Sequence, residues 1–129
     1  MAKLYDSGVS HHMSPFRAKF MMYHEIALWP IVAADKRVFY VVGVGDLAIQ
    51  VPHRKSSMPI ILKETLHAPD ILVTIVSVNQ ITKAEYTVSF KANLCKITRG
   101  DRIIGTIPIS VNRLYKVDHA GSAVTPSIE

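Results

Sequence analysis

The chain contains 129 residues, of which 49% are hydrophobic and 19% charged, which excludes an intrinsically disordered protein and fits one domain with a hydrophobic core. Its formal net charge is +5, but no more than two basic residues occur in a row, so we do not expect a nucleic-acid-binding groove. The single cysteine, Cys95, excludes an internal disulfide and a cysteine-based zinc site, and no apolar run is long enough to span a membrane.

The first motif lies close to the N-terminus, where Leu4-Tyr5 leads into Asp6-Ser7-Gly8. The apolar pair predicts a short buried strand, and the glycine permits a sharp turn after it. A carboxylate at such a position must be hydrogen-bonded or must share its proton with a second acid. Asp-Ser/Thr-Gly after an apolar pair is the signature loop of aspartic peptidases, in which two such loops meet. The tripeptide alone is also found in ordinary turns.

Two adjacent histidines, His11 and His12, follow this loop. Neither has a second ligand at helical spacing, so we interpret them as surface residues and expect no metal site. Ser14-Pro15 then predicts a turn into a short helical segment over residues 17–21.

From Trp29 onward the hydrophobic period becomes two, which is typical of β-strands. We predict strands over residues 30–33, 38–51 and 58–66, the first two joined by a polar hairpin tip and the last two by a polar turn. Gly43 and Gly45 lie inside the second strand, where they suit a bulge or a bend. Gly43–Ala48 matches the dinucleotide-binding fingerprint by its letters, but no helix follows, so we reject that function.

The run Ile71–Val76 predicts a strand buried on both faces, and Ser77 is the expected N-cap of a short helix that ends near Ala84. Residues 86–97 and 102–117 are expected to be extended, with a turn between them that contains Arg99-Gly100-Asp101. Residues 118–129 are expected to be disordered. The fold class is therefore mostly β: a small closed β-barrel with one or two short helices.

In combination, these segments resemble the retropepsin-like protease region of a copia-type retrotransposon Gag-Pol polyprotein. The matching segments have the family's order and spacing across residues 4–117, and they are 4–14, 33–36, 43–47, 66–70, 75–78 and 112–117. Two features depart from the family pattern. Val9 replaces a small residue or threonine, and only five residues precede Asp6.

The resemblance implies an aspartic endopeptidase whose catalytic residues are Asp6, Ser7 and Gly8, with Asp6 as the acid. No other aspartate here lies in an Asp-Ser/Thr-Gly sequence. One chain therefore supplies half of a catalytic pair, and activity would require a two-fold homodimer. Contacts with the substrate are assigned to the loop, an apolar strand and a flap, through Val9, Ala34, Asp35, Lys36, Ile75 and Val76.

The resemblance further implies that residues 1–117 form the protease domain and that residues 118–129 begin a linker to the pre-integrase region. Its substrates would be extended, mainly apolar segments of its own polyprotein, and no cofactor, metal or membrane would be involved. We expect a cytoplasmic location, virus-like particles included, in keeping with the single cysteine.

Two expectations oppose an active enzyme. The short segment before Asp6 leaves little chain for an interchain sheet, which predicts a monomer with weak or no activity. The alternative function is a catalytically inactive β-barrel remnant that serves as a structural or binding module.

Overall fold

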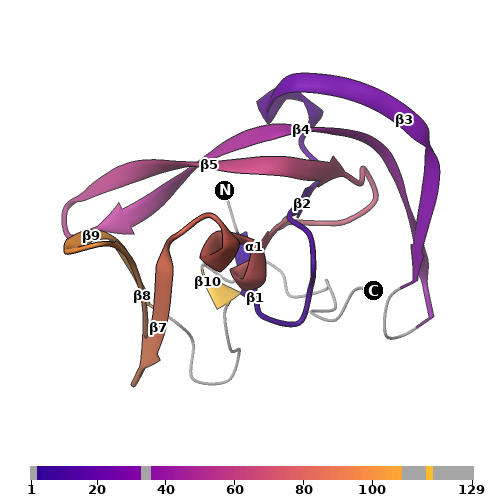
Figure 1. Ribbon diagram of the computed structural model, residues 1–129. Helices are drawn as coiled ribbons and strands as arrows, with labels where there is room; N and C mark the ends of the chain where they lie inside the picture. Colours follow the sequence, from indigo (N-terminus) through magenta and orange to yellow (C-terminus); the bar gives the residue numbers. More distant parts are fainter. Residues whose placement is uncertain (1–2, 33–35, 109–115, 118–129) are drawn as a thin grey trace.

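The computed structural model describes residues 3–32, 36–108 and 116–117, and most of them lie in strands (Figure 1). The only α-helix among them is α1 (Val78–Lys83), and a single 3-10 turn, η1, spans Arg17–Lys19. The strands are β1 (Lys3–Asp6), β2 (Met13–Ser14), β3 (Phe20–Val32), β4 (Val38–His53), β5 (Ser56–His67), β6 (Thr74–Ser77), β7 (Thr87–Lys91), β8 (Leu94–Arg99), β9 (Arg102–Pro108) and β10 (Lys116–Val117). The mostly-β fold class is confirmed.

The strands form two sheets. The larger has the order β10-β1-β6-β2-β5-β4-β3, and the smaller has the order β7-β8-β9. In Figure 1 the long β3–β4–β5 ribbon arches over α1 and β1, and the smaller sheet descends from one end of it. Most neighbours are antiparallel, but β1 pairs with β6 and β2 pairs with β5 in parallel.

The expected closed barrel is not present among the described residues. Within them, β3 pairs only with β4, and β7–β9 form a separate sheet without ladder hydrogen bonds to the larger one. Gly105 of β9 instead approaches the side of β4, where an added Cβ would collide with the Val51 side chain and lie 2.9 Å from the Pro52 carbonyl oxygen. The two sheets are thus held together by side-chain packing.

Strand β3 begins ten residues earlier than the sequence predicts, and only η1 remains of the expected helical segment. The ladder between β3 and β4 shifts register twice, between Met21 and His24 and between Glu25 and Trp29. Each shift interrupts the alternation of buried and exposed side chains. The period-two signal of a strand is therefore absent from this part of the sequence.

Gly43 and Gly45 of β4 allow β3 to approach closely. A Cβ at Gly43 would collide with the ring of Tyr23, and one at Gly45 would lie 2.8 Å from the carbonyl oxygen of Met21. The space left by Gly43 admits the Tyr23 hydroxyl to a hydrogen bond with His67 Nδ1, at 2.8 Å.

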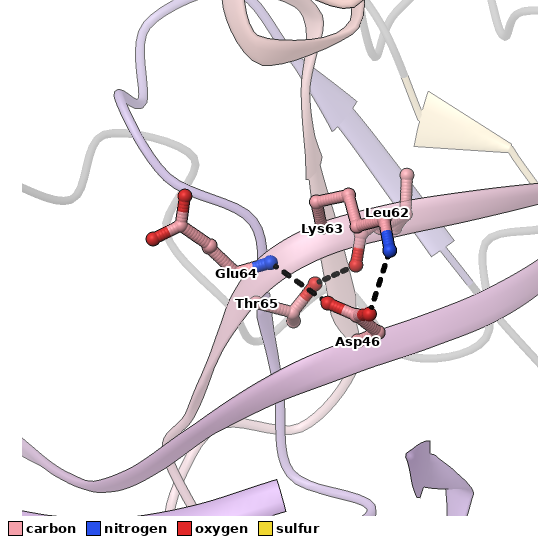
Figure 2. A network of polar contacts seen from close by, with 5 residues as sticks. All are labelled: Asp46, Leu62, Lys63, Glu64 and Thr65. Carbon is pink, nitrogen blue, oxygen red and sulfur yellow. Dashed lines mark hydrogen bonds and ion pairs between the residues drawn. The ribbon is translucent and has the colours of Figure 1, made fainter. Parts of the chain in front are cut away.

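The sequence suggested a bulge or bend inside β4 at these glycines, whereas the bulge beside them lies on the neighbouring strand β5. Asp46 of β4 lies opposite two residues, Lys63 and Glu64, and Glu64 has a positive φ of 51°. Figure 2 shows how the Asp46 carboxylate holds them: Oδ2 pairs with Lys63 Nζ at 3.0 Å, and Oδ1 accepts the Glu64 N–H at 3.3 Å. Thr65 Oγ1 donates to the Leu62 carbonyl across the bulge at 2.9 Å. Asp46 therefore has a structural role in the middle of a strand.

The buried side chains form two clusters, and β1 lies between them. Tyr5 belongs to the cluster that joins β4 and β5 to α1 and the smaller sheet, and it includes Leu47, Ile49, Val51, Ile60, Leu62, Ile81, Ile97 and Ile107. Leu4 belongs to the second cluster, with Val9, Met13, Ile31, Phe39, Val41, Leu66, Ile71 and Ile75. Because successive side chains of β1 anchor it on both sides, the position of the next residue, Asp6, is fixed.

Candidate functional site: the Asp-Ser-Gly loop

Asp6 is the last residue of β1, and its register partner on the parallel strand β6 is Ser77. Two adjacent parallel strands therefore end at the same edge of the sheet. On the β6 side the chain continues directly into α1, and on the β1 side it turns into the loop of residues 7–12. The loop and the start of the helix lie next to each other as a result.

The Asp6 carboxyl group is buried, with 5% of the residue exposed. Oδ1 accepts the backbone N–H of Gly8 at 2.7 Å. Oδ2 is buried as well and has no hydrogen-bond partner among the described residues. Burial raises the pKa of this carboxyl above its usual value, and the Gly8 N–H opposes that rise. The ionised form of Asp6 is therefore less favourable here than that of an exposed aspartate, and a second acceptor that shared its proton would reduce this cost.

Three side chains at the start of α1 hold the loop through its backbone carbonyls. Ser77 Oγ donates to the Val9 carbonyl at 2.8 Å, Asn79 Nδ2 to that of Ser7 at 3.3 Å, and Gln80 Nε2 to that of Ser10 at 2.7 Å. Ser77 also accepts the N–H of Gln80 at 3.2 Å, so its predicted role as the N-cap is confirmed. The short helix acts as a clamp on the loop.

His12 closes the loop and is not the surface residue that the sequence predicts. It is 4% exposed, and its Nδ1 accepts the backbone N–H of Ser77 at 3.0 Å. Burial, together with a smaller contribution from the neighbouring His11, lowers the pKa of His12 to about 4. The imidazole is thus neutral near pH 7, with its proton on Nε2. His11 is the more exposed of the pair, and its ring lies edge-on to Trp29.

The other predicted site residues fall into three groups. Ser7 and Gly8 are exposed at the tip of the loop. Val9, Ile75 and Val76, which were expected to contact a substrate, are at most 1% exposed and lie in the core. In this structure they support the loop from beneath and have no free surface to offer a peptide.

The remaining assignments concern the flap. Ala34 and Asp35 lie outside the described residues, whereas Lys36 is exposed and has a positive φ of 71°. Ile31 and Phe39, near the end of the β3–β4 hairpin, pack in the same cluster as Val9. The part of this hairpin next to its turn is therefore connected to the loop through the core.

Among the described residues, no set of three or more His, Cys, Asp or Glu side chains is arranged to hold a metal ion. None of the helices described is long and apolar enough to cross a membrane.

Residues 4–86 match the model of the family described as "Pol polyprotein, beta-barrel domain". The chain is also similar to the Retrovirus-related Pol polyprotein from transposon TNT 1-94 of Nicotiana tabacum, with 23% identity over 99 residues. This match covers 77% of the present chain but only 7% of the tobacco polyprotein. No solved structure shows a significant match. The similarity to the tobacco polyprotein agrees with the predicted resemblance to a retrotransposon polyprotein. Because the family model covers well over half of the sequence, the chain belongs to the β-barrel domain family of Pol polyproteins.

Proposed function

We propose that this domain is an aspartic endopeptidase that cleaves segments of its own polyprotein as a homodimer. One observation carries the proposal: Asp6 Oδ2 is buried at the end of a strand and has no partner among the described residues. An orphaned buried carboxylate oxygen is costly, and structures retain such groups mainly where they function. A second Asp6, brought in by a two-fold axis, is a partner with which this oxygen would share a proton once dimerisation had uncovered it.

The chemistry follows from the shared proton. Two carboxylates in contact cannot both ionise cheaply, so the pair holds one proton and one negative charge. The ionised carboxylate takes a proton from a bound water as the water oxygen attacks the scissile carbonyl carbon. The protonated carboxyl donates to the carbonyl oxygen, and the amine leaves with a proton returned from the pair.

Ser7 and Gly8 suit the roles that such a loop needs. The Ser7 residue is exposed while its carbonyl is fixed by Asn79, so its hydroxyl is available to the partner subunit's loop. Gly8 is exposed and has no side chain, which permits a peptide backbone to approach Asp6. Ala34, Asp35 and Lys36 would close over an extended, mainly apolar peptide as a flap.

A second candidate is the inactive remnant, a structural or binding module of the polyprotein. In a single chain Asp6 Oδ2 is out of contact with solvent. This burial favours the inactive module, because a catalytic oxygen must be reached by water. A catalytic water could reach it only if dimerisation or peptide binding uncovered it. The two candidates therefore differ in whether the assembled dimer exposes Asp6.

The deciding experiment incubates the purified chain with a peptide library at mildly acidic pH, with and without a transition-state inhibitor of aspartic peptidases. Asp6→Asn should abolish inhibitor-sensitive cleavage, while Asp101→Asn, a matched change at an exposed turn, should leave it unaltered. Sedimentation equilibrium on the same samples should show that activity increases with the dimer fraction. A dimer that cleaves nothing, or cleavage that survives Asp6→Asn, would favour the inactive module.

A further inference from the structure

Trp29 lies on the side of β3 that faces the core, yet 41% of the residue is exposed. It is opposite Val41 in the β3–β4 ladder, and Ile31, two residues later, is opposite Phe39. Opposed residues share one face of a sheet, and so do residues two apart in a strand. Val41, Ile31 and Phe39 are all buried in the core. The exposed part of the indole therefore lies at the margin of the core, on the inner side of the ribbon that β3 and β4 form.

The Asp-Ser-Gly loop reaches this margin through His11. The His11 ring is edge-on to the Trp29 ring, with the ring centroids 5.5 Å apart and an angle of 90° between the planes. Ser10 Oγ lies 2.9 Å from His11 Nδ1, and Gln80 Nε2 donates to the Ser10 carbonyl. The part of the loop that contacts the indole is thus held by α1, and it forms a fixed wall on one side of Trp29.

The indole is close enough to Asp6 to contact a peptide that is bound there. His11 follows Asp6 by five residues, and five residues span at most about 18 Å when fully extended. The chain between them turns as a loop, so the true separation is smaller. An extended peptide covers this distance with about five residues. Such a peptide could place one side chain on Trp29 while its backbone passes Asp6.

The chemistry of the indole selects the side chain. Aromatic rings pack on one another in edge-to-face or offset arrangements that are favourable beyond the area that they bury. A cationic side chain is also attracted to the face of an indole. The sequence at the hairpin tip, Asp35-Lys36-Arg37, has one more positive than negative charge, however, and like charges repel. The surroundings of Trp29 therefore favour an aromatic side chain over lysine or arginine.

We propose that Trp29 is a specificity-determining residue, whose exposed indole, together with His11, binds an aromatic side chain of the peptide that lies across the Asp-Ser-Gly loop. The inference rests on the proposed peptidase function and adds a substrate class to it. It gives a strand of the hairpin a substrate contact that sequence reasoning placed only at the tip, in Ala34, Asp35 and Lys36.

The first arm of the test measures binding. Because Trp29 is the only tryptophan in the chain, its fluorescence reports on this position alone. The full chain with Asp6→Asn, which should not cleave, is titrated with acetylated, amidated octapeptides in which one phenylalanine is moved along a background of alanine and serine. At one or more positions the phenylalanine peptide should change the fluorescence saturably. The same peptide with lysine in place of phenylalanine, and the unsubstituted background, should not.

The second arm measures cleavage of the same octapeptides by the chain with Asp6 intact. Trp29→Ala should lower the ratio of kcat/KM for the best phenylalanine peptide to that for its alanine counterpart by about tenfold, and Trp29→Phe should restore most of it. Both peptides meet the same amount of folded protein, so a loss of stability does not alter the ratio. Tyr40→Ala is the matched control, because Tyr40 is 45% exposed and lies opposite Pro30, on the outer side of the same ribbon. It should leave the ratio unaltered.

The outcomes separate this inference from the proposed function. Fluorescence changes that are specific to phenylalanine, without any cleavage, would support the binding surface and remove the peptidase. Cleavage whose preference for phenylalanine survives Trp29→Ala, or binding that is equal for lysine, would overturn the inference and leave the peptidase. The absence of a response to every octapeptide would also overturn it. So would Trp29 fluorescence that changes with the concentration of the chain alone, since a second copy would then occupy the surface.

Discussion

The imidazole of His12 accepts a hydrogen bond from the backbone N–H of Ser77, a residue 65 positions further along the chain. The bond joins the end of the Asp-Ser-Gly loop to the point where β6 becomes α1. It requires a neutral ring, because a protonated imidazole has no acceptor nitrogen. The loop geometry is therefore sensitive to the protonation of His12.

The first prediction concerns pH and stability. His12 has a pKa of about 4 in the folded chain and its ordinary value of 6.5 in the unfolded chain. The unfolded state thus binds the proton more tightly, and stability is lost as the pH falls from about 6.5 to about 4, by up to about 3 kcal/mol. Urea unfolding at several pH values measures this loss. His12→Gln should flatten the dependence in this window, and exposed His24→Gln should not. Equal slopes in all three proteins would contradict it.

The second prediction concerns Asp6, whose pKa shift has the opposite consequence. Its pKa is raised in the folded chain, so at neutral pH the buried carboxylate opposes folding, and this penalty is relieved as the pH falls towards the unfolded value of 3.8. Asp6→Asn keeps an acceptor for the Gly8 N–H and removes the charge. It should be more stable than the natural chain at pH 7, and the difference should shrink in acid. Asp101→Asn is the control, and a destabilised Asp6→Asn chain at pH 7 would show that the carboxylate has a stabilising partner.

A third prediction tests the clamp. Ser77→Ala removes both the donor to the Val9 carbonyl and the acceptor for the Gln80 N–H. The loss of a cap and of a buried hydrogen bond should cost about 2–3 kcal/mol in the free energy of unfolding. Thr82→Ala, in the same helix, removes an exposed hydroxyl that donates to the Asn79 carbonyl and should cost much less. Similar losses in the two variants would mean that the clamp adds little.

The fourth prediction concerns Val9, the departure from the family pattern. A bulky residue at this position suggests a crowded loop, but its side chain is 1% exposed and packs with Met13 and Ile75. Val9→Ala should therefore leave a void and destabilise the chain by about 1–3 kcal/mol. Val32→Ala, at a residue 48% exposed, is the matched control. A gain in stability in Val9→Ala would instead reveal overpacking.

Local sequence signals predicted the local features well. Ser77 caps a helix because its hydroxyl accepts a hydrogen bond from the amide of Gln80, three residues later. The turn at Gly100 depends on the positive φ of 59° that this glycine adopts. The alternation of apolar and polar residues in β4 could be recognised in the sequence because one face of that strand packs on the core. Each of these features depends on neighbours in the sequence.

The features that sequence reasoning missed depend on distant partners. His12 is buried because β1 and β6 pair in parallel, and nothing near His12 in the sequence indicates that pairing. The early start of β3 is concealed by its two register shifts. Residues 86–97 were predicted as one extended segment, but a hairpin turn separates β7 from β8 within them. The turn has no glycine to mark it in the sequence, because Ala92 adopts the positive φ of 54°. Asp6 was identified from its motif, but the orphaned Oδ2 became evident only from the folded chain.

The clamp also determines when the site can form during synthesis. Ser7, Val9 and Ser10 are held by residues 68 to 72 positions later in the chain. At about 5–20 residues per second on the ribosome, the loop emerges several seconds before the residues that fix it. For a time, therefore, the nascent chain contains Asp6 but not yet Ser77, Asn79 and Gln80, which hold its loop. A polyprotein segment made in this order cannot acquire a finished Asp-Ser-Gly loop until most of the domain has left the ribosome.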